Sequence, residues 1–379
     1  MSTPSMIVGI SVIHTIEIGH GMSRDKLIDF TRSQSAFPDN QMEQFLAGRI
    51  SELQAPEYQL PGFNKFTLYR RGNESYYFLR IVINPQVLLT DRPTVSLFCC
   101  TQDNVEALQE RFGEGLRIIT ATTFDPLLQW SVHRIDYAMD LYTPHAALFV
   151  ELAKQAKHPR DFIDRVNRPG SFYLECGSVT LNFYDKLDQM SKKRRQLGRL
   201  YNALCREATN VYRLEIQCSK SKRFEIMNDY GLSDISVCGF LDERIAQEKI
   251  QYYYRTTIGY GDYYSLAAVQ RRIEQARWRR PKKAGIYNWL RLIAQAGSYP
   301  DSVNMALGGT FLDDEPEVLV RIGERTLPDY VDSCRREGIN IVTIPAHRDI
   351  DYLPNPMPEE LRQYPPPRRR RTEVCSPPA

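Results

Sequence analysis

Three segments in the middle of the chain alternate polar and apolar residues with the period of a β-strand, and this pattern constrains the fold more than any other feature. The segments are 131–141, 179–186 and 211–217. Successive side chains of a strand point to opposite faces, so each segment has one apolar and one polar face. Antiparallel sheets commonly pack one face on the core and leave the other polar. We therefore expect these segments to be strands of an antiparallel sheet.

The polar faces of the three segments carry side chains that suit phosphate chemistry. These side chains are Arg134, Asp136 and Asp140, then Asn182, Tyr184 and Lys186, then Arg213, Glu215 and Gln217. Same-face residues of paired strands lie within about 5 Å of one another. Grouped carboxylates suit Mg²⁺ or Mn²⁺, which offsets phosphate charge, and a tyrosine beside such an ion can act as a nucleophile. A merely solvent-facing strand surface would show the same alternation, so the pattern alone leaves both interpretations open.

The other segments mix strand and helix patterns without a regular βαβ rhythm. This mixture predicts an α+β fold, with a central antiparallel sheet flanked by helices and a mainly helical C-terminal region. We expect an α+β domain over residues 1–265, a helical region over 266–355 and a disordered Pro/Arg-rich tail over 356–379. Further strands are predicted at 6–18, 63–71, 74–83, 171–174 and 339–344. Helices are predicted at 24–34 after a Ser23 cap, and at 144–156, 188–208, 266–273, 287–296 and 326–337.

Positive charge is concentrated in short runs, although the formal net charge is only +3. The runs lie at 192–195, 277–283 and 368–371, and they are either solvated faces or contacts for a polyanion. The 8 cysteines form no Cys-x-x-Cys pair, as expected for reduced thiols of a cytoplasmic protein. The apolar stretch 6–13 is too short to cross a bilayer, so we expect no secretion signal and no membrane partner.

The order and spacing of the three segments resemble a known family of enzymes. Residues 134–140 (RIDYAMD), 182–186 (NFYDK) and 212–216 (YRLEI) are similar to motifs of the gene II/X family of phage replication proteins and of the related rolling-circle plasmid initiators. The resemblance is good over residues 130–230 and loose elsewhere. It implies origin-specific nicking of one DNA strand in a bacterial host: a tyrosine is joined to the 5′ phosphate, and the freed 3′ hydroxyl primes synthesis. The implied partners are origin DNA, single-stranded at the nick, and a host helicase and polymerase; a homodimer is compatible with it.

The resemblance also assigns roles to individual residues. Tyr184 resembles the nucleophile, Asp136 and Glu215 resemble carboxylate ligands of Mg²⁺ or Mn²⁺, and Asp140 is a further candidate ligand. Lys186 and Arg213 would hold the phosphate or stabilise developing charge, and Arg134 would contact DNA. One departure is that many related nickases bind metal through a His-hydrophobic-His pair. This chain has no such pair, and its His14 and His20 are six residues apart.

A second group of residues is predicted to contact DNA outside the three segments. The basic run could grip phosphates through Arg277, Arg279, Arg280, Lys282 and Lys283. Tyrosines are dense at 252–254 and at Tyr263 and Tyr264, where they either pack an aromatic turn, stack unpaired bases or supply the nucleophile. Two other functions stay open: a non-catalytic origin-binding initiator, and a hydrolytic metal nuclease that does not need Tyr184.

Overall fold

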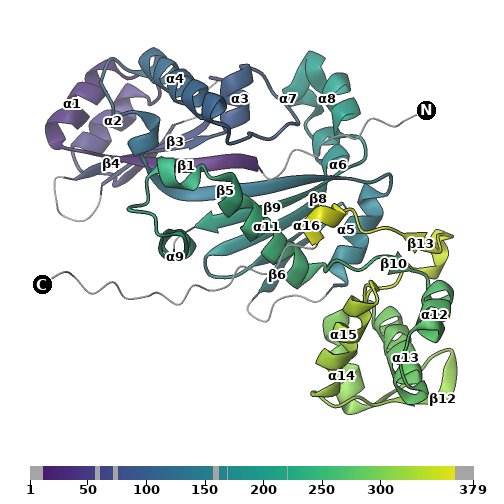
Figure 1. The fold of residues 1–379 in the computed structure, drawn as a ribbon. Helices are drawn as coiled ribbons and strands as arrows, with labels where there is room; N and C mark the ends of the chain where they lie inside the picture. The colour runs from purple at the N-terminus through teal and green to yellow at the C-terminus, as the bar shows by residue number, and fades with distance from the viewer. Residues whose placement is uncertain are drawn as a thin grey trace, which may run out of the picture.

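The computed structural model describes residues 12–55, 60–70, 76–156, 162–168, 170–219 and 221–362. Its centre is a nine-stranded sheet in the order β2-β3-β4-β1-β5-β9-β8-β7-β6, in which all neighbours are antiparallel (Figure 1). The predicted α+β class with a central antiparallel sheet is therefore confirmed. The strands are β1 Val12–Met22, β2 Glu52–Gln54, β3 Phe63–Arg70, β4 Tyr77–Ile83, β5 Ser131–Tyr142, β6 Ile163–Arg168, β7 Ser171–Glu175, β8 Val179–Asp185 and β9 Val211–Ser219.

One face of this sheet carries the hydrophobic core. On β5 and β9 the buried apolar residues alternate with polar ones, as Ile135, Tyr137, Leu214 and Ile216 illustrate. Different helices cover the two faces of β8 and β9. On the apolar face lies α5 (Ala146–Lys154), where the ring of Phe149 is 6.0 Å from that of Tyr212. On the other face α6 (Lys186–Ser191) packs near the segment whose Val95 carbonyl accepts a hydrogen bond from Arg213.

The helices of the first two thirds follow their sequence signals in most places. Ser23 accepts a hydrogen bond from the backbone of Lys26 and caps α1, as predicted. The single helix predicted at 188–208 is wrong: the chain breaks it at Gly198, whose φ is 51°. The helices are α1 Arg24–Ser33, α2 Asp39–Leu46, α3 Pro85–Thr90, α4 Gln102–Ile119, α7 Arg194–Leu197, α8 Tyr201–Ala208, α9 Ser221–Tyr230, α10 Val237–Phe240 and α11 Glu243–Thr257.

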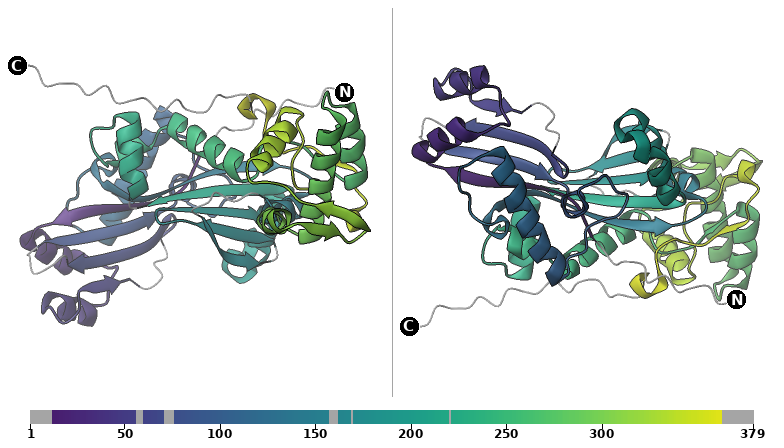
Figure 2. Two further views of the ribbon diagram at one scale, coloured as in Figure 1. Left: turned by 90° about the horizontal axis from the view of Figure 1, so that it is seen from below. Right: turned by 90° about the horizontal axis from the view of Figure 1, so that it is seen from above.

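The C-terminal region forms a compact group of elements beyond one end of the sheet (Figures 1 and 2). It is mainly helical, as predicted, and it is tied to the larger part by a short pair of strands, β10 and β13. Residues 339–344, predicted as a strand, make only isolated bridges to Asp262 and Ser265. The elements of this group are β10 Tyr263–Tyr264, α12 Leu266–Gln275, α13 Arg280–Ala296, α14 Tyr299–Gly308, β11 Thr310–Leu312, β12 Glu315–Val320, α15 Thr326–Arg336 and β13 Tyr352–Leu353. The chain then returns to the larger part, where α16 Glu359–Arg362 lies near α11 (Figure 1).

Two terminal predictions can be compared with the described residues only in part. Residues 356–362 were predicted as disordered, but they are ordered: Met357 is buried, and Arg362 donates a hydrogen bond to the carbonyl of Asn355. The side chain of Asn355 holds this segment in place by donating hydrogen bonds to the carbonyls of Gly259 and Gly261. Residues 363–379, with the basic run 368–371, lie outside the described residues, as does the turn predicted at 72–73. Among the described residues, no helix is both long and apolar enough to cross a membrane.

Candidate metal and tyrosine site

The polar face of four adjacent strands, β1, β5, β9 and β8, gathers the candidate site. In the register of the sheet, Glu215 lies opposite Asn182 on β8, and Tyr184 lies opposite Arg213 on β9. On the other side of β9, Asp136 of β5 lies opposite Gln217, which is two residues from Glu215 and on the same face. The three segments predicted to be neighbouring strands are therefore adjacent, with their polar residues on the same face.

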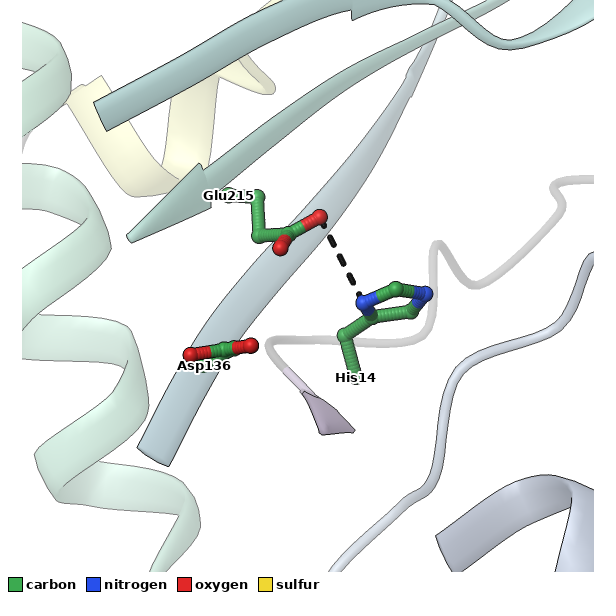
Figure 3. A group of neighbouring side chains, drawn as sticks. All are labelled: His14, Asp136 and Glu215. Carbon is green, nitrogen blue, oxygen red and sulfur yellow. Dashed lines mark ion pairs between the residues drawn. The ribbon is translucent and has the colours of Figure 1, made fainter. Parts of the chain in front are cut away.

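Three side chains on this face form a group that could hold a metal ion. One ligand atom from each of His14, Asp136 and Glu215 lies within 4.8 Å of the others (Figure 3). His14 reaches the group from a β-bulge, because Ile13 and Thr15 are consecutive partners of β5 and His14 is the extra residue between them. Its Nδ1 lies 3.4 Å from Oε2 of Glu215.

Burial and neighbouring charges together shift the pKa values of this group. It raises the pKa of Asp136 well above its usual range, helped by the charge of Glu215 and opposed by Arg134, whose Nε lies 3.0 Å from Oδ1 of Asp136. Burial would also raise the pKa of Glu215, but His14, Gln217 and Arg213 outweigh it and lower that pKa. Burial lowers the pKa of His14, which favours the neutral imidazole that binds metals.

These three residues fit a divalent cation. Two carboxylates in a buried site repel each other, and a cation between them removes that repulsion. Oδ1 of Asp136 is buried and has no hydrogen-bond partner in the described part of the chain, although the ion pair with Arg134 reaches it. One imidazole and two carboxylates suit Mn²⁺, and Mg²⁺ binds such sites with water as additional ligands.

Tyr184 is directly connected to this group. Its hydroxyl donates a hydrogen bond to Oε2 of Glu215 at 3.1 Å, the same oxygen that faces His14. Burial and the charge of Glu215 raise the pKa of Tyr184 well above its usual value, and only 3% of the residue is exposed. Tyr184 borders a cavity of ≈ 190 Å³ whose lining includes Tyr173, Lys192 and Lys193. Asp185 and Asp188 also line this cavity, and Asp188 pairs with Lys192 at 2.5 Å, so the lining carries charges of both signs.

The two predicted phosphate-binding cations flank Tyr184. Arg213 is 1% exposed and binds both carboxylate oxygens of Asp140, at 2.5 and 2.6 Å. Asp140, predicted as a further metal ligand, is outside the metal group because this pairing occupies its carboxylate. The Nζ of Lys186 lies 5.6 Å from the centre of the Tyr184 ring and 2.7 Å from Oε1 of Gln189, and burial lowers its pKa.

Sequence reasoning missed two residues of the site. His14 was noted only as half of an absent histidine pair, and the available signal was a histidine between the apolar residues Ile13 and Ile16 of the predicted strand. Tyr173 was not singled out, although β7 places it opposite Asn182 and therefore on the same polar face. It is half-buried and lines the same cavity as Tyr184. The available signal was that Tyr173 lies two residues from both Ser171 and Glu175, so a strand would place all three on one polar face.

The predicted DNA contacts outside the sheet differ in accessibility. Tyr263 is completely buried with its ring 5.4 Å from that of Phe149, so its predicted base contact is wrong. Tyr264 is half-buried and lies against Tyr352. Around the N-terminus of α13 the arginines are exposed, whereas Lys282 pairs with Asp329 and Lys283 bonds the carbonyl of Glu274. The exposed arginines are Arg277, Arg279 and Arg280.

Comparisons with family models and with curated proteins identify no relative of this chain. No protein-family model matches the chain, and no curated protein matches it. The function proposed next is therefore based on the geometry of the site, together with the order of the three motif strands.

Proposed function

We propose that this protein nicks and rejoins one strand of DNA to initiate rolling-circle replication, using a divalent metal and Tyr184 as the nucleophile. The observation that supports this best is the hydrogen bond from Tyr184 to Glu215, which joins a tyrosine hydroxyl to the His14–Asp136–Glu215 group. A buried tyrosine that shares an oxygen acceptor with a candidate metal site suits nucleophilic attack on phosphorus.

The chemistry is a phosphoryl transfer in two reversible halves. The oxygen of Tyr184 forms a bond to the phosphorus, and the bond from phosphorus to the 3′ oxygen breaks. The 3′ oxygen takes up a proton and leaves as a hydroxyl, while the 5′ phosphate stays on the tyrosine. Oε2 of Glu215 accepts a hydrogen bond from the Tyr184 hydroxyl, and because the pKa of Glu215 is lowered it would pass that proton on to the departing 3′ oxygen rather than keep it. His14, Asp136 and Glu215 would hold the cation, which neutralises charge on the phosphate. Rejoining is the reverse reaction, so the phosphodiester energy is retained.

Cations of the chain itself assist at the tyrosine. The guanidinium of Arg213 is held by Asp140 opposite Tyr184, and its charge favours the tyrosinate. Lys192 and Lys193 line the cavity beside Tyr184, where a phosphate would enter. Tyr184 itself is 3% exposed and borders this cavity.

Two other functions predict different behaviour of the same residues. A non-catalytic origin-binding protein has no need for a histidine and two carboxylates buried together, and burying unpaired carboxylates costs stability. A hydrolytic nuclease would use the metal group with water as the nucleophile. Its carboxylates would be essential, whereas Tyr184 would be dispensable.

The test is cleavage of single-stranded oligonucleotides from the genome's own origin with Mn²⁺, analysed on a denaturing gel. We expect a slowly migrating protein–DNA adduct that disappears with EDTA and in Tyr184→Phe, and persists in Tyr173→Phe and Tyr264→Phe. An adduct lost only in Tyr173→Phe would move the nucleophile to β7. Cleavage without an adduct would support the nuclease, and binding without cleavage would leave the origin-binding protein.

A further inference from the structure

The polar face that carries the metal group continues across β1 onto β4 and β3. Arg134, which pairs with Asp136, lies opposite Glu17 of β1 in the register of the sheet. Glu17 in turn pairs with Arg80 of β4, whose NH1 is 3.0 Å from Oε1 of Glu17. Arg80 then donates a hydrogen bond to the hydroxyl of Tyr69 on β3, at 2.8 Å. Two ion pairs, the register pair of Arg134 with Glu17 and one hydrogen bond therefore lead from the metal group across β1 and β4 to β3.

This series ends at three aromatic rings, which we call the aromatic platform: Tyr69, Tyr76 and Phe78. The rings of Tyr69 and Phe78 are stacked with centres 5.4 Å apart and planes 13° apart. Tyr76 meets Phe78 edge-on at 4.9 Å and is 49% exposed. The guanidinium carbon of Arg80 lies 4.8 Å from the centre of the Tyr69 ring. The platform is thus a partly exposed group of aromatic rings with a cation at its edge.

Two glycines of β1 allow side chains to lie close against the backbone on this face. A Cβ at Gly21 would be 2.3 Å from the hydroxyl oxygen of Tyr76, and a Cβ at Gly19 would be 2.4 Å from Nε2 of His133. Glycine in the interior of a strand weakens it and marks a close approach by another group. At Gly21 the approaching group is the exposed ring of Tyr76, which lies flush with the sheet.

We propose that the aromatic platform binds unpaired bases of the DNA strand whose phosphate is cut at the metal group, an inference that rests on the proposed function. Aromatic side chains stack on single-stranded bases, and arginines beside them contact the phosphates. The platform is three strands across and six residues along β1 from Asp136, which corresponds to roughly 25 Å. It therefore binds bases several nucleotides from the nick, with Arg80 and Arg134 along the path. Duplex DNA keeps its bases stacked and gains nothing from these rings.

The test measures binding without cleavage. Fluorescence anisotropy of a labelled oligothymidylate of about 20 nucleotides, in EDTA, isolates stacking from the metal chemistry. We expect Tyr76→Ala to weaken single-strand binding by about 10-fold, and Tyr69→Ala with Tyr76→Ala to weaken it further. Gly21→Ala, which displaces the Tyr76 ring and deletes no aromatic group, should also weaken it. Binding of a duplex of the same length should change less than 2-fold, by the same reasoning.

A matched control is available at the other end of the molecule. Tyr352 is 50% exposed and lies 5.3 Å from the ring of Tyr264, so Tyr352→Ala removes an equally exposed aromatic side chain far along the chain from the platform. Single-strand affinity unchanged in the Tyr69, Tyr76 and Gly21 variants overturns the proposal, as does an equal loss in Tyr352→Ala or an equal loss of duplex binding. Adduct formation by the wild-type protein is scored separately. Its absence would refute nicking while leaving the binding result to decide the platform.

Discussion

Replacement of Asp136 by asparagine should stabilise the metal-free protein and at the same time abolish its response to Mn²⁺. Asp136 is 1% exposed, and its carboxylate shares the buried group with Glu215. Its pKa in the folded protein is raised by burial and by Glu215, so ionisation of this carboxyl costs folding free energy above the unfolded pKa of about 3.9. Asparagine keeps the shape and removes the charge.

The expected magnitudes follow from two opposing contributions. Removing the strained carboxylate stabilises the fold, the lost ion pair with Arg134 offsets part of that gain, and a net increase of about 1 kcal/mol at pH 7.5 is expected. The difference should shrink as the pH falls through the folded pKa and disappear below about pH 3, where the carboxyl is protonated in both states. In the wild type, Mn²⁺ at 100 times its Kd should add about 2.7 kcal/mol, or roughly 3–5 °C in Tm.

The assay is thermal and urea unfolding, each in EDTA and in Mn²⁺. Asp140→Asn is the matched control, because Asp140 is on the same face but pairs with Arg213 outside the metal group. It should lower stability by leaving a buried guanidinium without its carboxylate, and it should keep the Mn²⁺ shift. If Asp136→Asn destabilises the metal-free protein and retains the full Mn²⁺ shift, the assignment of this group as a metal site is wrong.

Three further perturbations test other parts of the molecule. Burial, Arg80 and Arg223 lower the pKa of His133 to about 4, so the unfolded chain takes up a proton at this histidine first, and the free energy of unfolding falls between about pH 6.5 and pH 4. After discounting for partial exposure, His133→Gln should remove about 1–2 kcal/mol of that loss, as measured by urea unfolding at several pH values. An unchanged pH profile would contradict this prediction. Changing Arg277, Arg279 and Arg280 to Gln should reduce the slope of the logarithm of the duplex-DNA association constant against the logarithm of salt concentration by about 2–3. Lys282→Gln should change this slope little, because Lys282 is already paired with Asp329. Gly261→Ala would place a Cβ 2.4 Å from the backbone of Ile339 and Asn340 and should cost about 1–3 kcal/mol in unfolding free energy, while Gly308→Ala, with open space around it, should be tolerated.

The alternation of β5, β8 and β9 was sufficient to predict which residues share the polar face. Asp136, Glu215 and Tyr184 each lie on the polar face because the alternation of a strand depends only on local sequence, and the pairing of β5 with β9 and of β9 with β8 brings these faces together. His14 was not predictable in this way, since a bulge shifts the parity of β1 and the pairing of β1 with β5 joins segments more than 100 residues apart. Asp140 was placed on the correct face, but its bidentate pairing with Arg213 takes it out of the metal group.

Tertiary packing decided the predictions that sequence patterns could not. Tyr263 was expected to reach DNA, yet Phe149 from the distant α5 covers it. The predicted helix 188–208 has a suitable charge pattern, but Gly198 adopts a positive φ and separates α7 from α8. Residues 356–362 were part of the predicted tail, and the buried Asn355 just before them binds the loop at Gly259 through hydrogen bonds that composition does not reveal.

The division of the central sheet into one apolar and one polar face has a consequence for how the protein can change over time. Substitutions at Ile135 or Leu214 disturb the core, whereas their sequence neighbours Arg134 and Arg213 belong to the face that carries the charged groups. Selection for folding and selection for activity therefore act on alternate residues of the same strand. A saturation scan of β5 scored once for abundance and once for DNA joining should give two profiles that are both periodic in two residues and out of phase with each other. Such separation lets the chemistry diversify while the core stays fixed.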